Sequence, residues 1–176
     1  MAEADPRLRG WMAAARGGDA SAFARVAAVA QDPLYRLALA NGLGAVDAAE
    51  ATQETLARAY EHRRRFRADG DAMPWLYGIL MNVVREYRRR RRPRAIDLET
   101  LAGAPSEVEA GRERLEALSR ALERLPDRQR EAVACRYLRG LSVRQTAEAM
   151  GCAEGTVKAA TSAGLARLRG LMQEHR

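Results

Sequence analysis

The stretch Leu141–Leu168, LSVRQTAEAMGCAEGTVKAATSAGLARL, predicts two short helices joined by a tight turn. Ser142 and Gln145 have the spacing of a capping box, in which the Ser hydroxyl accepts from the backbone amide of Gln145 and the Gln side chain reaches back. Gly151 stands where a chain leaves a helix through a left-handed residue, which glycine adopts without steric cost. A second helix is expected from about Glu154. The residues expected to face inward are Val143, Ala147 and Met150 in the first helix and Val157, Leu165 and Leu168 in the second.

Two interpretations fit this stretch. Two short helices set at an angle by a glycine turn are a common way to present one helix to the major groove of DNA. Glycine turns also join the helices of ordinary bundles. The stretch alone favours a DNA-binding helix-turn-helix over a simple helical hairpin.

The composition allows one domain or two small ones and argues against wholesale disorder, because 47% of the 176 residues are hydrophobic and 30% are charged. No apolar run approaches the roughly 18 residues that a membrane span needs, and the first residues, MAEADPRLRG, are unlike a signal peptide, so we expect a cytosolic protein. Cys135 and Cys152 lie far from His62 and His175 in the sequence. We therefore predict no metal or redox site, no cofactor and no small-molecule substrate.

The charge is distributed in two basic blocks. The net charge of +7 and the pI near 10.2 indicate a polyanionic partner. Residues 1–92 carry 16 arginines against 11 acidic residues, and residues 112–176 carry 13 basic against 8 acidic residues. Between them, residues 93–111 carry one arginine against four acidic residues and contain proline and glycine. This distribution predicts two modules, 1–92 and 112–176, on a flexible acidic linker.

The apolar spacing is helical along the chain, and no alternating strand pattern is visible, so we predict an all-α fold. In the first module Gly17-Gly18 ends one helix, Asp19 caps the next, and Pro33 is expected to begin another. In the second module helices are expected over 112–125 and 128–139. The residues expected to face inward are Leu8, Trp11, Met12, Ala15, Phe23, Val26, Ala27, Ala30, Leu34, Leu37, Leu39, Leu115, Leu118, Leu122, Leu125, Val133, Tyr137 and Leu138, with Cys135 near that face and Gly140 as the final cap.

The helix expected over about 48–64 has one acidic and polar side, formed by Asp47, Glu50, Gln53 and Glu54. Asp47, with Glu50 three residues on, repeats the capping pattern. Acidic residues early and arginines late also complement the helix dipole, and this explanation is favoured on physical grounds alone. The alternative is a docking surface for a protein partner, distinct from the surface that faces DNA.

A basic loop and an arginine-rich helix follow. The loop 62–67, HRRRFR, leads through a polar turn to a helix expected from Pro74 to about residue 92. Its last part, 85–92, holds six arginines and one glutamate, and such a run is usually a solvated helix end. Phosphates would nevertheless relieve the repulsion between these arginines, and aromatic rings beside a basic loop suit single-stranded bases. An apolar and aromatic stripe, for which core packing is the ordinary explanation, consists of Trp75, Ile79, Val83 and Tyr87.

Two parts of the chain together resemble the extracytoplasmic-function (ECF) group of bacterial sigma factors, which keep only two domains. Residues 125–169, LPDRQREAVACRYLRGLSVRQTAEAMGCAEGTVKAATSAGLARLR, resemble the C-terminal promoter-reading domain of sigma factors. Residues 46–66, VDAAEATQETLARAYEHRRRF, and 75–92, WLYGILMNVVREYRRRRR, resemble their N-terminal domain. The resemblance covers roughly residues 8–172, and the pair of motifs is far more specific than either alone.

The resemblance implies a promoter-specificity subunit that is not an enzyme. It implies binding to core RNA polymerase, at the β′ clamp and the β flap, and to promoter DNA, and it makes an anti-sigma partner expected. The acidic helix would bind polymerase through Asp47, Glu50, Gln53 and Glu54. The −10 element would be melted and read as a single strand by Arg63, Arg64, Arg65, Phe66, Arg67, Asp69, Trp75, Tyr77, Asn82, Arg85, Arg88 and Arg89. The −35 element would be read in the major groove by Arg144, Glu154, Gly155, Thr156, Lys158, Ala159 and Ser162.

The chain departs from the family pattern at several positions. After Lys158, family members often carry Ser-Arg-Leu and another arginine three residues later, whereas this chain has Ala159-Ala160-Thr161 and Ala163. A bidentate arginine contact to guanine is typically worth about 1–3 kcal/mol of discrimination, so −35 binding is expected either to be weaker or to depend on DNA shape and phosphate contacts. Elsewhere, Ala153 stands at the usual helix cap, Ala72 where an aromatic residue is frequent, and Gly78 and Met81 where arginine is frequent.

Three other functions compete with a sigma factor. An ordinary helix-turn-helix regulator binds duplex DNA alone, usually as a dimer, and needs neither the acidic helix nor the aromatic and basic loop. A protein-interaction module, such as an anti-sigma adaptor or a polymerase-binding decoy, would bind polymerase without melting promoter DNA. A nucleic-acid-modifying enzyme is disfavoured, because the sequence has no metal cluster and no glycine-rich phosphate loop.

Overall fold

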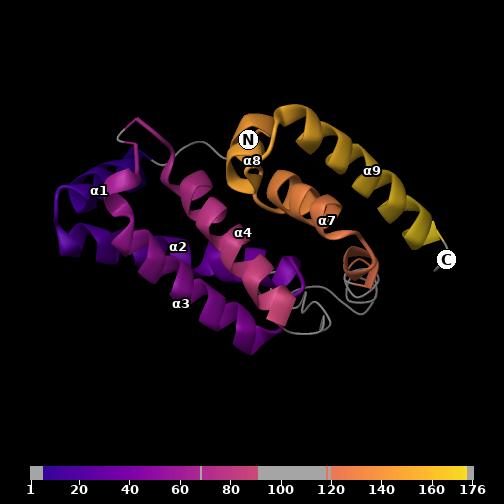
Figure 1. Cartoon of the computed structure of the whole chain (residues 1–176), viewed down its shortest axis with the longest axis horizontal. Coiled ribbons are helices and arrows are strands. Elements are labelled where there is room, and N and C mark those ends of the chain that lie inside the picture. The colour runs from indigo at the N-terminus through magenta and orange to yellow at the C-terminus, as the bar shows by residue number, and fades with distance from the viewer. Residues whose placement is uncertain (1–5, 68, 91–117, 119, 174–176) are drawn as a thin grey trace, which may run out of the picture.

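The computed structural model describes residues 6–67, 69–90, 118 and 120–173, and every regular element in these ranges is a helix, which confirms the all-α prediction. The predicted linker 93–111 and Leu115 lie outside the described residues. Figure 1 shows α1–α4 gathered at one end of the molecule and α7–α9 at the other, with α4 facing the second group. The elements are α1 (Pro6–Arg16), α2 (Ala20–Ala40), α3 (Ala45–Glu61), the 3₁₀ turn η1 (Arg63–Arg65), α4 (Ala72–Arg90), α7 (Asp127–Val133), the π-helical turn η2 (Ala134–Leu138), α8 (Val143–Met150) and α9 (Glu154–Gln173).

The first four helices share one apolar core, because each turns a stripe of buried residues toward the others. Asp19 caps α2 as expected, with its carboxylate accepting from the amide of Ala22 at 3.0 Å. Helix α1 buries Leu8, Met12 and Ala15 of the predicted face. The fully buried side chains that fill this core include Met12, Val26, Leu34, Leu37, Leu39, Leu76, Leu80, Met81, Val83 and Val84.

The prediction that Pro33 begins a new helix is wrong, because α2 runs without a break from Ala20 to Ala40 with Pro33 inside it. Proline removes one backbone donor and crowds the preceding turn. The residues after it, Leu34 and Leu37, are completely buried, so packing of both halves of the helix against one core outweighs that local cost.

Two predicted helix starts are displaced. Helix α3 begins at Ala45 after an extended Gly44 that makes no side-chain cap, so Asp47 lies inside the first turn and is not the capping residue. An acidic residue in the first turn still complements the helix dipole there. Helix α4 begins at Ala72, two residues before Pro74, whose missing amide is one that the first turn leaves unpaired in any case.

The prediction that Tyr137 is buried is wrong, because its side chain is 60% exposed. The helix predicted over 128–139 runs as α7 only to Val133 and then widens into the π-helical turn η2. A π turn inserts one residue into the helical register, so the side chains beyond it rotate relative to the predicted face. Val133 and Cys135 are buried as expected, whereas Leu138 is only half-buried.

The helix-turn-helix prediction is confirmed in detail. The Ser142 hydroxyl accepts from the amide of Gln145 at 3.1 Å, and the Gln145 side chain accepts from the amide of Ser142 at 2.8 Å. Gly151 ends α8 in the left-handed conformation, with φ 62°, and α9 begins at Glu154. Within the predicted inward set, Ala147, Met150, Val157 and Leu168 are buried, and Val143 and Leu165 are half-buried.

Substituting Ser142→Ala is expected to lower the free energy of unfolding by about 1 kcal/mol, because it removes the side-chain half of the capping box at the start of α8. Urea denaturation followed by circular dichroism measures this change. Ser162→Ala is the matched control, since Ser162 is exposed inside α9 and caps no helix. An equal loss in both variants would contradict a capping role for Ser142.

No helix within the described residues is long and apolar enough to span a membrane. Within the same residues, no three His, Cys, Asp or Glu side chains gather in a way that could hold a metal ion. Cys135 and Cys152 are both free thiols, and burial raises the pKa of Cys135 to about 12. The Cys135 thiol is therefore a small apolar group in the core.

Candidate nucleic-acid and protein interfaces

The exposed side of α3 carries three of the four residues predicted to bind a protein partner. Glu50, Gln53 and Glu54 face solvent, while Thr52 and Thr55 point inward and donate their hydroxyls to backbone carbonyls one turn earlier. Asp47 is different, because it is only 6% exposed in the first turn of the helix. The exposed acidic side is therefore shorter by one residue than the sequence predicted.

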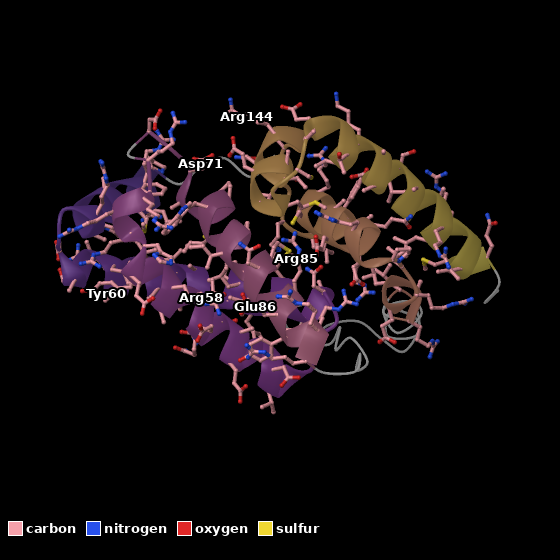
Figure 2. All side chains as sticks on the ribbon, viewed as in Figure 1. Arg58, Tyr60, Asp71, Arg85, Glu86 and Arg144 are labelled. Atoms are coloured by element: carbon pink, nitrogen blue, oxygen red, sulfur yellow. The ribbon has the colours of Figure 1, made fainter. Side chains whose placement is uncertain are left out.

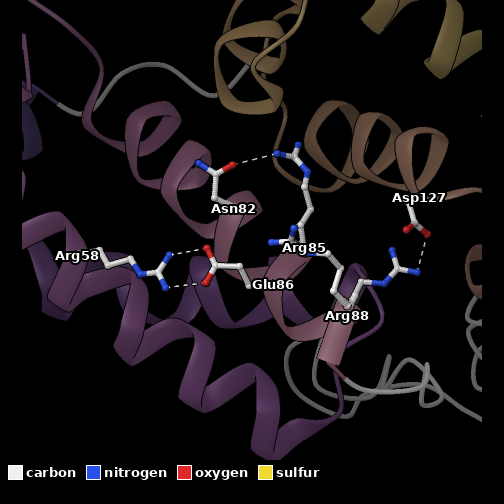
Figure 3. Close-up of a pocket in the computed structure, with 7 residues that line it drawn as sticks. Arg58, Asn82, Arg85, Glu86, Arg88 and Asp127 are labelled. Atoms are coloured by element: carbon white, nitrogen blue, oxygen red, sulfur yellow. Dashed lines mark hydrogen bonds and ion pairs between the residues drawn. The ribbon is translucent and has the colours of Figure 1, made fainter.

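Arg58 joins this acidic side to α4. Its guanidinium donates to both carboxylate oxygens of Glu86, at 2.9 and 2.8 Å (Figure 3). It also donates to Glu54 at 2.7 Å. This pairing lowers the pKa of Glu86, since Arg58 stabilises its ionised form. The bidentate geometry fixes the relative position of α3 and α4, so the orientation of the acidic side is set by the core of the bundle.

The basic loop after α3 is only partly available to a ligand. Arg63 turns back on the protein, where it donates to the carbonyls of Tyr60 at 2.7 Å and Ala15 at 3.2 Å and lies 4.1 Å from the centre of the Tyr60 ring. Arg67 forms an exposed pair with Asp69 at 3.0 Å. Arg64 and Arg65 are exposed. The loop therefore offers a short row of arginine charges to solvent.

The aromatic residues beside this loop belong largely to the core. Phe66 is 2% exposed and packs edge-on against Trp75, with ring centres 5.5 Å apart. Stacking of a nucleic-acid base on Phe66 would require that pair to separate. Trp75 is half-buried and keeps part of its surface accessible. Core packing thus accounts for Phe66, which the resemblance had implied as a contact for the −10 element.

The remaining predicted −10 residues lie on the side of α4 that faces α7 and η2. Tyr77 is 5% exposed, and burial raises the pKa of its phenol to about 12. Arg85 and Arg88 are half-buried, whereas Asn82 and Arg89 are exposed. Asn82, Arg85, Arg88 and Arg89 line a cavity of about 610 Å³ together with Arg58, Glu86 and Asp127 (Figure 3).

The predicted −35 residues form a coherent exposed surface. Arg144 on α8 is exposed, with its guanidinium 3.8 Å from Glu148 (Figure 2 marks Arg144). On the other side of the turn, α9 is held against α7 at Gly164, where a Cβ would lie 2.8 Å from the Val133 side chain. That close contact leaves the first turns of α9 free to face outward. The exposed residues there are Glu154, Gly155, Thr156, Lys158, Ala159 and Ser162.

Comparison with known proteins agrees with this arrangement. Residues 29–94 match the family model for sigma-70 region 2, and residues 115–168 match the model for sigma-70, region 4. The chain is 33% identical over 165 residues to the ECF RNA polymerase sigma factor SigM of Mycobacterium tuberculosis, covering 92% of this chain and 82% of SigM. The chain is an ECF sigma factor. As such it binds core RNA polymerase and directs promoter recognition in transcription initiation.

Other relatives support the same family and fold. The ECF sigma factor SigL of Mycobacterium tuberculosis is 34% identical over 151 residues, which cover 80% of this chain and 83% of SigL. Among solved structures, CnrH in complex with the cytosolic domain of CnrY matches 97% of this sigma factor and 99% of that chain at a TM-score of 0.78, with 23% identity. The match to the Bartonella quintana sigma factor RpoE in complex with the anti-sigma factor NepR covers 84% of this chain and 95% of that chain, at a TM-score of 0.66 and 25% identity.

Several departures of this sigma factor from the family pattern have a packing explanation. Ala72 is 4% exposed and Met81 completely buried, so both fill the core of the bundle. Ala160 packs beside Val157 at the contact between α8 and α9. Gly78 lies against the backbone of Ala149 in α8. Ala160 and Gly78 therefore fit close helix contacts in place of arginine, and Met81 fills the core in place of a charged side chain.

Sequence reasoning missed the acidic residues of α7 that pair with α4. Glu131 binds Arg85 through two hydrogen bonds of 3.0 and 2.9 Å, and Asp127 binds Arg88 at 2.6 Å. The partners in each pair are about 40 residues or more apart in the sequence, so no local spacing rule links them. The one available signal was the spacing of Asp127 and Glu131, which places two acidic residues one turn apart on the same helix face.

Proposed function

We propose that this sigma factor binds the β′ clamp of core RNA polymerase through Glu50, Gln53 and Glu54 on α3. The proposal is supported by their exposure and shared acidic character, and by the Arg58 contacts that hold α3 firmly against α4. Asp47 supports the helix from its first turn, since it is buried. A rigid, preorganised surface binds a partner without an ordering cost.

The −10 element is contacted by the loop after α3 and by α4. Arg64, Arg65 and Arg67 are exposed for the phosphate backbone, and the accessible part of Trp75 lies beside them for a base. Asn82, Arg85, Arg88 and Arg89 continue this surface along α4. Phe66 contributes indirectly, because it holds Trp75 in place.

The −35 element is contacted by α9, and the exposed surface at the start of this helix is the observation that carries the proposed function. The first amides of a helix bind phosphate, and Lys158 adds a positive charge one turn later. Small side chains at Gly155, Ala159 and Ser162 leave room for close approach to the major groove. Recognition there depends on phosphate contacts and groove shape more than on arginine-to-guanine pairs.

The chain divides into a polymerase and −10 domain, residues 1–92, a linker, 93–111, and a −35 domain, 112–176, which also meets the β flap of polymerase. The boundaries follow the two matched family regions and the charge distribution. An anti-sigma factor is a further partner, since the solved structures of CnrH and RpoE hold such complexes or a partner's cytosolic domain. The protein acts in the cytoplasm, where the polymerase is, and catalyses no reaction of its own.

Run-off transcription with core RNA polymerase on a library of genomic promoter fragments tests the proposed function. Transcripts that appear only when this sigma factor is added are the expected result, and alignment of their upstream sequences would give both promoter elements. Absence of transcripts with retained binding to duplex DNA would indicate an ordinary helix-turn-helix regulator. Absence of transcripts with tight binding to core polymerase would indicate a decoy or adaptor.

A further inference from the structure

Helix α1 lies outside both parts of the chain that match the family models, which are residues 29–94 and 115–168. Its inner side packs into the core through Leu8, Met12 and Ala15. Its outer side carries Arg9 and Arg16, both exposed, and no residue of the helix is acidic. A basic side on a surface helix favours an anionic partner. The core explains the inner side of α1 and leaves its arginines without an assigned role.

The two arginines lie on one face of α1, because seven residues make about two helical turns. Their Cα atoms are therefore about 10 Å apart along the helix axis. The half-buried Ala13 lies between them close to the same face, so the row between the two side chains carries only a methyl group. Two positive charges in such a row suit an extended anion.

The end of α1 is bound to the basic loop that follows α3. The Arg63 Nε donates to the carbonyl of Ala15 at 3.2 Å, and the Arg16 Nε donates to the carbonyl of Arg64 at 3.4 Å. These reciprocal hydrogen bonds hold the last turn of α1 against η1. Arg16 is therefore a neighbour of Arg64, whose side chain is exposed.

The start of α1 meets the other end of the same loop. Arg9 donates to the Asp71 carboxylate at 3.4 Å, and Asp71 directly precedes α4. Figure 1 shows α1 beside the segment that joins α3 to α4, and Figure 2 marks Asp71 there. The arginines of α1 thus follow the basic loop from η1 to the start of α4.

Both guanidiniums keep most of their donors for a ligand. Within the described part of the chain, each makes one hydrogen bond to the protein, through a single nitrogen. A guanidinium has five N–H donors. The ion pair of Arg9 with Asp71 contributes little to stability, because the Arg9 side chain is 45% exposed. A phosphate can therefore engage both arginines in bidentate contacts.

We propose that α1 is part of the DNA interface, and that Arg9 and Arg16 bind phosphates of the melted promoter strand beside the bases that the loop after α3 contacts. This inference rests on the proposed function of that loop. The combined surface favours a nucleic-acid strand over a protein partner, because it is continuous with the −10 interface and carries more arginines than acidic residues. Its members are Arg9, Arg16, Arg64, Arg65 and Arg67, with Asp69 and Asp71.

The double variant Arg9→Gln/Arg16→Gln tests the phosphate contacts. Its holoenzyme is titrated with a fluorescein-labelled fragment of a promoter that the parent transcribes, mismatched so that the −10 element stays single-stranded. Anisotropy measures binding at several salt concentrations. About ten-fold weaker binding is expected at low salt. The magnitude of the slope of log K against log salt should fall by about 1.4, because each phosphate contact to a single strand contributes about 0.7.

Two variants control this measurement. Arg9→Lys/Arg16→Lys keeps both charges and should keep most of the salt dependence, whereas a purely structural role of the arginine contacts predicts the same loss as with glutamine. Arg25→Gln removes one exposed arginine from α2, to which no DNA contact is assigned, and should bind as the parent does.

Photocrosslinking identifies what α1 contacts in the promoter complex. Gly10 is exposed, and a Cβ there would have no neighbour within 4 Å, so the helix accommodates p-benzoylphenylalanine at this position. We expect a crosslink to the melted strand next to the −10 element. The same group in place of Val29, which is exposed on α2, is the control and should leave the DNA unlabelled.

A crosslink from position 10 to a polymerase subunit in place of DNA, or to neither, would overturn the proposal. Unchanged DNA binding of the glutamine variant, a lysine variant as weak as the glutamine variant, or an equal loss in Arg25→Gln would overturn the assignment of the two arginines. Absence of run-off transcription with the parent contradicts the proposed function itself. A parent that transcribes, with a glutamine variant that binds the promoter normally, contradicts only the role of α1.

Discussion

The Arg130→Met variant is expected to lose about 3 kcal/mol of unfolding free energy, because it removes a buried guanidinium on which several backbone carbonyls depend. Arg130 is 4% exposed and donates to the carbonyls of Leu122 at 3.0 Å, Leu125 at 2.7 Å and Glu123 at 3.2 Å. These carbonyls end the helical segment before Pro126, where no backbone amide continues the helix. Methionine fills the space but removes these three hydrogen bonds, including the buried bond to the Leu125 carbonyl, whereas the Leu122 carbonyl keeps the backbone amide of Leu125 at 3.1 Å.

Burying the Arg130 guanidinium has an electrostatic cost. Burial, followed by the nearby positive charge of Arg88, lowers the pKa of Arg130 from its ordinary value, so the protein holds this charge in an unfavourable environment in return for the hydrogen bonds it makes. Its guanidinium also lies 3.4 Å from the Asn41 carbonyl, beside the left-handed Gly42. Arg130 therefore supports both the C-terminal domain and its contact with α2.

Thermal unfolding followed by circular dichroism measures the effect, and about 3 kcal/mol corresponds to a fall in Tm of about 6–12 °C for a chain of this size. Arg120→Met is the matched control, since Arg120 is exposed on the helical segment that Arg130 supports. Arg130→Lys keeps the charge but loses the planar fork, so it should fall between the two. Equal stability of Arg130→Met and the parent would show that the carbonyls find other partners.

The features that the sequence predicted well depend on local physical chemistry. The capping box at Ser142 and Gln145, the left-handed Gly151 and the cap at Asp19 each involve residues within a few positions of one another. Helical periodicity likewise identified most of the buried stripe of each helix. Local rules apply to such features because the interacting groups are close in the chain whatever the tertiary structure does.

The features that the sequence missed depend on tertiary contacts. Pro33 lies inside α2 because the core on both sides of it is continuous, and Tyr137 turns outward because η2 shifts the helical register. The pairing of Glu131 with Arg85 joins residues 46 positions apart. No spacing rule along one chain predicts which of many acidic residues an arginine will meet.

The same distinction between local pattern and tertiary contact applies to the residues of the candidate interfaces. Exposure of Lys158 and Ser162 follows from the amphipathic pattern of α9, and this part of the site was predictable. Burial of Phe66, Tyr77 and Asp47 was not, because each faces a neighbouring element whose position the sequence does not reveal. A residue type suited to DNA or protein binding thus identifies a candidate, and only its tertiary environment decides whether it is available.

The Gln53→Arg variant places a positive charge on the acidic side of α3. It is expected to weaken binding to core RNA polymerase at least ten-fold and to reduce run-off transcription in proportion. Like charges or unpaired charges inside a protein interface typically cost about 2 kcal/mol or more. Gln53 is the most informative position on this surface. Glu54 pairs with Arg58 and Glu50 accepts from Tyr87 at 3.4 Å, whereas within the described part of the chain no hydrogen bond or ion pair engages the Gln53 side chain.

Because the exposed Gln53 side chain makes no hydrogen bond or ion pair within the described part of the chain, its substitution separates docking from folding. Thermal unfolding of Gln53→Arg should match the parent, and so should its binding to a single-stranded oligonucleotide, since α4 and α9 are unchanged. Gln31→Arg makes the same substitution at an exposed position of α2 and should keep full polymerase binding. If Gln53→Arg binds core polymerase as tightly as Gln31→Arg does, the acidic side of α3 serves only to complement the helix dipole, and polymerase must dock elsewhere.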